Sequence, residues 1–331
     1  MSFETKKNVA LVDMLQARRK CKRSSCRTYA STLMRIHREF SKRNFNLNLK
    51  WLSEDADKIL KGIKKLASVN VKRNLLGAGL VGLSVTKDEK NSKLWIEYLK
   101  KLNEQKIQFD RSGELTAKQK TNWIEWPQII RLRKQLTRQV NLSKLYQRVP
   151  SKKGFSTMQQ NLILSMLTLL PGVARREYPT LRFITKKAFE ALPDKTGQNW
   201  LITGPKYKII YQDYKTARTY KAVSILVPEH SKVLQRLLVK HVRWLKSHFP
   251  ENDFLFLTQS YSPMTRNAFT KFLQRLFRQH FGKKNVSTTM LRHIFLSHKY
   301  SKSALDEQEN TAKFMMHSPA MQREYVKRPP K

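Results

Sequence analysis

The sequence lacks an apolar run long enough to cross a membrane. Its longest apolar stretch, residues 162–170, is interrupted by Ser165 and Thr168 and ended by Pro171. That is well short of the roughly 20 residues that a membrane span needs. Residues 1–15 also lack the apolar segment of a secretory signal. A membrane role is therefore not expected.

Cysteine is nearly absent as well. Only Cys21 and Cys26 occur, within a basic run, and no cluster of His or Cys accompanies them. A zinc site is therefore not expected, and a single spacing does not establish a disulfide. We predict that both are ordinary thiols in a reducing compartment.

Acidic residues are scarce relative to basic ones. The 331 residues contain 66 Lys plus Arg against 24 Asp plus Glu, a formal net charge of +42. The excess runs through the whole chain, so the folded body itself is basic and attracts polyanions. Nucleic acid is the expected partner, because each phosphate that the protein neutralises releases a counterion. An acidic membrane surface, or a structural role in a ribosome or virion, is the alternative that charge alone leaves open.

The first third of the chain has the periodicity of helices. Apolar side chains recur at helical spacing, as Leu33, Ile36 and Phe40 do. We predict a compact helical domain over residues 1–105. The polar stretch 106–121 has no such period and is predicted to be a linker.

The rest of the chain, residues 122–331, is predicted to form a second domain. It consists mainly of helical segments, with three short pieces rich in Ile, Val, Tyr and Trp around residues 199–228. These pieces predict a three-stranded sheet. The predicted fold class is mainly α with a small antiparallel β-sheet (α+β).

Four short segments of the second domain contain the residues that bear on chemistry. They are Arg175 and Arg176 within residues 171–178, Lys215 within 214–216, Thr289, Arg292 and His293 within 289–293, and His317 followed by Tyr325. In this order and spacing they resemble the tyrosine recombinase (phage-integrase-like) superfamily. That family has an Arg, a hairpin Lys, a His-x-x-Arg, a His or Trp and a Tyr in succession. The resemblance extends over residues 123–331, and the helical region before it resembles the family's DNA core-binding domain. Glu177, Tyr178 and Leu181 favour the viral or mobile-element type.

The resemblance implies a role for each of these residues. Arg175 and Arg292 would stabilise negative charge on the phosphoryl oxygens, since a guanidinium fork binds two oxygens and stays charged. Lys215 would protonate the leaving 5′ oxygen as a general acid. His317 would hydrogen-bond the scissile phosphate, and His293 would pack beneath the site.

Tyr325 would be the nucleophile. A phenol with an ordinary pKa near about 10 attacks well only beside positive charge or a base. The product would be a 3′-phosphotyrosyl intermediate that preserves the bond energy for religation. Neither a metal nor a cofactor is then required, which agrees with a sequence that lacks a carboxylate cluster and a phosphate-binding glycine loop.

The sequence departs from the family pattern in three places. Thr289 stands where His or Lys is usual, and threonine is a poor acid–base group at neutral pH. Arg175 and Arg176 are adjacent, so the catalytic one is not fixed, although Arg175 fits the following residues better. Only six residues follow Tyr325, where many members carry a longer helix that docks on a neighbouring subunit. The expected homo-oligomer, a dimer to a tetramer on paired duplex DNA sites, is therefore open in its mode of assembly.

Taken singly, each of these residues has an ordinary explanation. A given Lys or Arg in so basic a chain is usually a solvated charge or a phosphate contact, and buried histidines are common in cores. The basic run 18–27 is interpreted first as a solvated helix face, then as a DNA clamp, and last as a nuclear localisation signal.

The predicted function is site-specific recombination or integration of DNA. A type IB topoisomerase or telomere resolvase would use the same chemistry with a different outcome. A DNA-binding structural protein with weak catalysis, or an RNA-binding or virion-packaging protein, are the alternatives from other classes. The target sequence, the host and the direction of recombination are not readable, and the expected location is wherever the DNA lies inside the cell.

Overall fold

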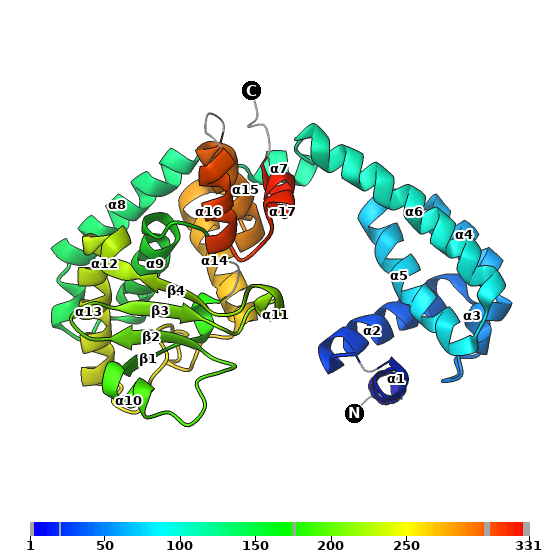
Figure 1. The fold of residues 1–331 in the computed structure, drawn as a ribbon, viewed down its shortest axis with the longest axis horizontal. Helices are drawn as coiled ribbons and strands as arrows, with labels where there is room; N and C mark the ends of the chain where they lie inside the picture. Colours follow the sequence, from blue (N-terminus) through cyan, green and yellow to red (C-terminus); the bar gives the residue numbers. More distant parts are fainter. Residues whose placement is uncertain (1–2, 20, 175–176, 301–304, 327–331) are drawn as a thin grey trace. The chain divides into compact units, whose positions relative to one another are not determined.

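The computed structural model describes residues 3–19, 21–174, 177–300 and 305–326. The chain divides into two compact units, Met1–Ser112 and Gly113–Lys331, which are described separately (Figure 1).

The regular elements of the N-terminal unit are all helices among its described residues. Its helices are α1 (Phe3–Arg19), α2 (Arg23–Phe40), α3 (Lys50–Glu54), α4 (Ala56–Lys65), α5 (Val69–Thr86) and α6 (Glu89–Ser112). Leu33 and Ile36, which the periodicity places on the core side of α2, are fully buried. A Cβ at Gly79 of α5 would lie 2.1 Å from the Cζ3 atom of Trp95 on α6. Only glycine therefore allows α5 and α6 to pack this closely.

The predicted linker 106–121 is mostly helical in the structure. The helix α6 continues to Ser112, and a second helix, α7 (Ala117–Asn122), begins after four residues. An ion pair between Lys106 and Asp110, one turn apart, supports the end of α6. A capping box between Thr116 and Gln119 starts α7. Polar interactions of this kind stabilise a helix without an apolar stripe, which is why periodicity missed both.

The prediction of two free thiols differs from the structure, in which Cys21 and Cys26 form a disulfide. Cys26 lies in the first turns of α2, and Cys21 comes just before that helix. The Cα atoms are 6.5 Å apart, within the range that a disulfide bridges. The bridge joins the start of α2 to the segment that links it to α1.

The C-terminal unit combines helices with one small sheet. Its helices are α7, α8 (Trp126–Leu142), η1 (Leu145–Gln147), α9 (Lys152–Leu169), η2 (Tyr178–Thr180), α10 (Lys186–Glu190), α11 (Ala217–Tyr220), α12 (Val227–His230), α13 (Lys232–His248), α14 (Arg266–Phe281), α15 (Thr288–Lys299), α16 (Leu305–Phe314) and α17 (Pro319–Tyr325). The helix α9 is buried on most of its surface and forms the centre of the core. The α+β class is therefore confirmed.

The sheet has four strands where three were predicted. They are β1 (Leu181–Thr185), β2 (Asn199–Thr203), β3 (Lys208–Tyr211) and β4 (Val223–Leu226), in the order β1-β2-β3-β4 (Figure 1). The strands β2, β3 and β4 are antiparallel, as predicted, but β1 pairs with β2 in parallel, so the sheet is mixed. Parallel neighbours need a long connection, and a strand 13 residues away from its partner leaves no hairpin signal.

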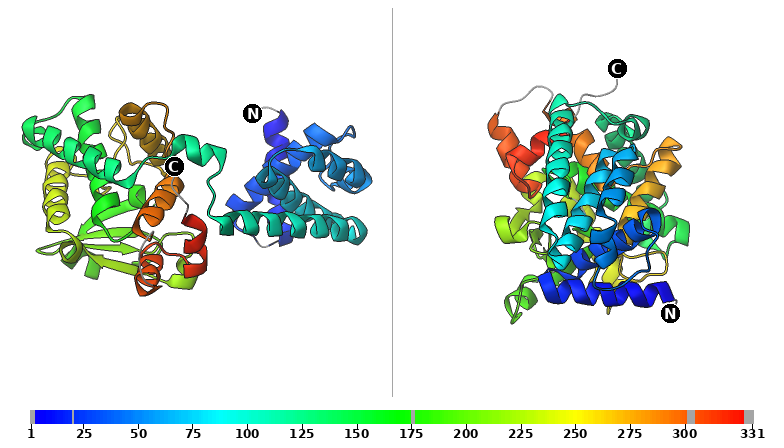
Figure 2. Two further views of the ribbon diagram at one scale, coloured as in Figure 1. Left: turned by 90° about the horizontal axis from the view of Figure 1, so that it is seen from above. Right: turned by 90° about the vertical axis from the view of Figure 1, so that its right-hand side faces the viewer.

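The last helix of the chain, α17, packs against two earlier helices. The helix α17 contacts both α15 and α16, and Figures 1 and 2 show α16 and α17 next to each other. This packing brings residues near position 292 together with residues near position 325.

Candidate active site

Arg292 is the centre of the candidate site. It lies on α15, whose first turn is capped by the Ser287 hydroxyl, and its side chain has no solvent exposure. The guanidinium donates from Nη1 to the carbonyl of Val173 at 3.0 Å and from Nη2 to the carbonyl of Met315 at 2.9 Å. Burying a charge is costly unless it is hydrogen-bonded. These two carbonyls hold the planar fork in one orientation.

Tyr325 lies directly beside that guanidinium. It is the last residue of α17, a helix that Ser318 caps and that begins with Pro319. The Cζ atom of Arg292 is 5.1 Å from the centre of the Tyr325 ring. The α15–α17 contact therefore places a buried cation against a phenol that is 9% exposed.

Both histidines of the predicted site contact the same ring. The His293 ring centre is 4.9 Å from that of Tyr325, and the His317 ring centre is 5.5 Å away. An Nδ1–H of His293 would donate to the backbone carbonyl of Tyr325, at 2.8 Å. The structure thus brings together four residues, Arg292, His293, His317 and Tyr325, that are up to 33 positions apart in the sequence.

This arrangement suits the chemistry of a phenol nucleophile. A fixed cation in a low-dielectric interior stabilises negative charge that develops on a nearby oxygen far better than one in water does. His293 ties the end of α17 to α15, so the ring and the guanidinium keep their separation. The cluster can therefore stabilise a phenolate, a phosphoryl oxyanion, or both in turn.

The predicted first arginine, whether Arg175 or Arg176, lies outside the described residues. Just before them, the carbonyl of Val173 accepts from Arg292. A Cβ at Gly172 would lie 2.9 Å from Cγ of Met315. The segment before Arg175 therefore packs against the segment before His317.

Lys215 lies in the turn between β3 and α11, and its side chain is exposed. Its neighbour Thr216 donates a hydrogen bond of 2.7 Å to the carbonyl of Met316, directly before His317. Among the described residues, no hydrogen bond or ion pair joins the Lys215 side chain to the Arg292 cluster. The Thr216 hydrogen bond holds the turn that carries Lys215 next to the segment that carries His317.

The residues that hold this turn did not stand out in the sequence. The Asn199 side chain accepts from the backbone amides of Gln212 and Asp213, both at 2.9 Å, and is fully buried at the start of β2. Asp213 in turn binds the guanidinium of Arg266, the first residue of α14, at 2.6 Å. A lone Asn opening an otherwise apolar strand was the available signal, because a buried amide needs hydrogen-bond partners.

Thr289, the departure from the family pattern, lies on the first turn of α15 with an exposed side chain. It precedes Arg292 by three residues, so both lie on neighbouring turns of one helix face. Glu177, Tyr178 and Leu181 are all buried, at 6% exposed or less. Burial also raises the pKa of Tyr178.

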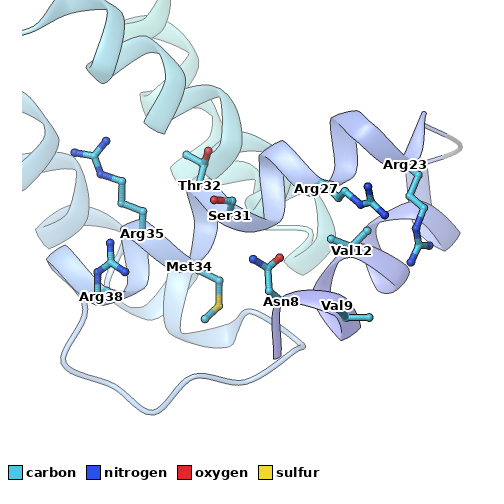
Figure 3. Close-up of a pocket in the computed structure, with 10 residues that line it drawn as sticks. All are labelled: Asn8, Val9, Val12, Arg23, Arg27, Ser31, Thr32, Met34, Arg35 and Arg38. Atoms are coloured by element: carbon cyan, nitrogen blue, oxygen red, sulfur yellow. The ribbon is translucent and has the colours of Figure 1, made fainter. Parts of the chain in front are cut away.

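The N-terminal unit has a groove lined by arginines between α1 and α2. Figure 3 shows Arg23 and Arg27 toward one end of the groove, Arg35 and Arg38 toward the other, and Ser31 between them. Arg23 is anchored by Asp13 at 2.7 Å and by Gln16 at 3.0 Å. Ser31, Thr32 and Met34 complete the α2 side, and Asn8, Val9 and Val12 form the α1 side. The volume is about 760 Å³.

The fold is similar to that of a solved site-specific recombinase. The chain is similar to the solved structure of the XerH site-specific recombinase bound to its difH substrate in a pre-cleavage complex. The TM-score is 0.55 at 18% sequence identity, over 96% of this chain and 80% of that one. At this identity the likeness shows the fold alone.

A weaker similarity, with a TM-score of 0.39 and 12% identity, relates the chain to the XerA recombinase, over 97% of this chain and 93% of that one. No protein-family model matches the sequence, and no curated protein does. Among the helices that the structure describes, none is long and apolar enough to cross a membrane.

Proposed function

We propose that this chain is a DNA strand-transfer enzyme of the tyrosine recombinase type, acting through Tyr325. The observation that carries the proposal is the contact of the buried Arg292 guanidinium with the Tyr325 ring. An arginine without solvent exposure, held by two backbone carbonyls, is costly to keep in a fold. Its position beside the predicted nucleophile gives it a chemical purpose.

In the proposed reaction, Tyr325 Oη attacks the phosphorus of one DNA strand and loses its proton to solvent. A bond forms between Oη and phosphorus, and the bond from phosphorus to the 5′ oxygen breaks. Lys215 supplies the proton that the departing 5′ oxygen takes up. Arg292, with Arg175 or Arg176, stabilises the charge on the non-bridging oxygens, and His317 donates a hydrogen bond to one of them.

Rejoining runs the same steps in reverse. A free 5′ hydroxyl attacks the phosphotyrosyl bond, and Tyr325 leaves with its electron pair. When the hydroxyl comes from a second duplex, strands are exchanged. We propose that this exchange takes place in a homo-oligomer on paired duplex sites, and that the chain belongs to the viral or mobile-element type that Glu177, Tyr178 and Leu181 resemble.

The arginine-lined groove supports DNA binding by the N-terminal unit. Arg35 follows Arg23 by twelve positions, which is roughly 18 Å along a helix. The major groove of DNA is about 12 Å wide and admits a helix. With α2 in that groove, the arginines at its two ends would reach phosphates on opposite strands, and Ser31 and Thr32 would face the base edges. The XerH neighbour is a complex with its DNA substrate, which supports the same partner for this chain.

The test is a covalent adduct. The full-length protein is incubated in EDTA with nicked suicide duplexes taken from the flanks of its own gene, and the mixture is run on a denaturing gel. We expect an adduct whose peptide map places DNA on Tyr325, and we expect none from Tyr325→Phe. Tyr261→Phe is the matched control, since Tyr261 is a half-buried tyrosine of the same unit with no part in the cluster.

A second function is favoured by one observation. Thr289 occupies a turn where the family has an acid–base group, so the chain could bind DNA with little cleavage. Strong, salt-sensitive DNA binding with no adduct would support this structural role. In that case Thr289→His, which restores the usual group, should produce an adduct, and only if Arg292 and Tyr325 are intact.

A further inference from the structure

A groove between α9 and α14 ends on a buried polar side chain. One wall is a face of α9 with Lys152, Phe155 and Gln159, and the other is a face of α14 with Phe272 and Arg275. The loop that begins at residue 257 closes one side. The volume is about 370 Å³, and the groove lies wholly within the C-terminal unit, apart from the Arg292 cluster.

Gln159 is the unusual residue of this groove. Its side chain is 1% exposed, and neither Oε1 nor Nε2 has a hydrogen-bond partner among the described residues. The next two polar residues of α9 each make a side-chain hydrogen bond: Gln160 donates to Gln279 at 3.2 Å, and Asn161 accepts from Thr137 at 2.7 Å, although the Asn161 Nδ2 has no partner among the described residues. A buried amide without partners destabilises a fold, whereas a leucine of similar size would not. A ligand that supplies one donor and one acceptor would account for it.

The charge of the groove indicates the rest of that ligand. Lys152 and Arg275 stand on opposite walls, and no Asp or Glu lines the groove among the described residues. The N-terminal end of α9, which adds partial positive charge, is at Lys152. The rest of the lining combines apolar side chains, among them Phe155, Met264 and Phe272, with the uncharged polar residues Ser156, Thr258, Gln259 and Ser260.

We propose that this groove binds a short acidic segment of a partner protein. A peptide group of the segment pairs with Gln159, one N–H to Oε1 and one C=O to Nε2. An apolar side chain fills the space against Phe272, and a carboxylate binds Lys152 and Arg275. Peptide recognition of this kind, with a few polar contacts in a mostly apolar groove, is typical of modest, regulated interactions.

Two other occupants fit the groove less well. A nucleic-acid base needs an open aromatic face for stacking, but Phe155 is 1% exposed and packs against Trp244 and Tyr261. A second copy of this chain brings a net charge of +42 toward a cationic groove. The partner is therefore an acidic protein other than this chain.

The experiment selects peptides on the intact protein. A library of random displayed heptapeptides is enriched on the full-length chain and depleted on Gln159→Leu. We expect the enriched peptides to combine Asp or Glu with an apolar residue. A synthetic copy should bind the parent chain and lose at least about tenfold in affinity with Gln159→Leu or Arg275→Ala. The matched controls are Lys153→Ala and Arg278→Ala, exposed neighbours that do not line the groove, and they should bind normally.

Thermal unfolding gives a readout that needs no ligand. Gln159→Leu should raise the melting temperature of the free protein, by about 2–4 °C for each kcal/mol of unmet hydrogen bonding removed. A fall of several degrees would mean that the amide is satisfied within the fold, and would overturn the proposal. So would a library with no enrichment, Gln159-dependent binding of a seven-residue oligothymidylate, or Gln159-dependent self-association. DNA cleavage by Gln159→Leu should be unchanged, which separates this site from the proposed active site.

Discussion

Arginines are used in opposite ways in the two units of the molecule. In the N-terminal groove they are exposed, with 47% of the Arg23 side chain and 42% of the Arg35 side chain in contact with solvent. In the C-terminal unit Arg292 is fully buried and bonded to two backbone carbonyls. In a chain with 66 Lys and Arg, residue type alone does not distinguish the two uses. Burial and backbone hydrogen-bond partners distinguish them. An exposed arginine attracts polyanions in general, whereas a guanidinium held in one orientation stabilises charge at one position.

Removing the buried arginine should have the largest effect. Arg292→Ala removes the guanidinium charge and the N–H groups that are not bonded to the two carbonyls, and each lost donor to a developing oxyanion is worth about 10²–10³ in rate. We expect the rate of adduct formation to fall by about 10⁴ or more. The free energy of unfolding should also fall, by about 2–4 kcal/mol, because two buried carbonyls lose their donors. DNA affinity at fixed salt should stay within about threefold.

The matched control is Arg27→Ala on α2, which should weaken binding and leave the rate of the bound complex unchanged. Arg292→Lys sharpens the test, since lysine keeps the charge but cannot reach both carbonyls as a planar fork does. If Arg292→Lys cleaves at the parental rate, orientation of the guanidinium is not what matters at this position.

Lys215 should rank next. Lys215→Ala removes the proposed acid, and general acid catalysis contributes about 10²–10⁴-fold. A bridging 5′-phosphorothiolate has a leaving group that needs no proton, so cleavage of that substrate should return to near the parental rate. The control is Lys206→Ala, an exposed lysine in the turn between β2 and β3, which should cleave both substrates normally. Loss of activity on both substrates with Lys215→Ala would argue for a binding role instead.

The family resemblance assigned Arg292, His293, His317 and Tyr325 to one site because they occur in a fixed order. In the structure the guanidinium of Arg292 and the rings of His293 and His317 lie 4.9–5.5 Å from the centre of the Tyr325 ring. The role of each in catalysis stays a prediction. The α+β class followed from helical periodicity and from short β-prone pieces, since both are local properties of the chain.

What the sequence did not reveal depends on contacts between distant segments. The strand β1 pairs in parallel with β2 across a helix, so no hairpin marks it. The backbone amides of Gln212 and Asp213, next to the turn that carries Lys215, donate to the Asn199 side chain. These hydrogen bonds form only once the sheet has formed. The disulfide between Cys21 and Cys26 depends on the turn before α2, which spacing alone does not fix.

Removing the exposed arginines should have a smaller effect, and of a different kind. The double variant Arg27→Ala with Arg35→Ala removes two proposed phosphate contacts, one toward each end of α2. The slope of log affinity against log salt should become shallower by about 2, and binding should weaken to a similar degree on all sequences. The control pairs Lys58→Ala with Lys61→Ala, exposed lysines of α4 away from the groove. A loss confined to one DNA sequence would instead assign base reading to these arginines.

Replacing His241 should have the smallest effect on stability and cleavage. It also tests whether burial alone identifies a catalytic residue. Like Arg292 it is fully buried and bonded to a backbone carbonyl, that of Leu255, and the Tyr146 hydroxyl is 3.1 Å from its Nδ1. Burial lowers the pKa of His241 to about 4, from 6.5. The imidazole is therefore neutral in the folded state, and the unfolded state takes up its proton first as the pH falls. The contribution of the neutral His241 side chain to the free energy of unfolding is complete above pH 6.5, and it is lost as the pH drops from 6.5 toward 4.

When the pH is lowered from 7.5 to 5, the titration of His241 should lower the free energy of unfolding by about 2 kcal/mol, measured by urea titration. His241→Gln keeps a polar side chain of similar size but cannot titrate, so its loss over the same pH range should be smaller by that amount. Its cleavage rate at pH 7.5 should be near that of the parent, because no part of the Tyr325 cluster touches it. An equal pH dependence in the two proteins would mean that other groups dominate acid unfolding. A cleavage defect as large as that of Arg292→Ala would show that burial with a carbonyl partner, without contact to Tyr325, already suffices for a catalytic effect.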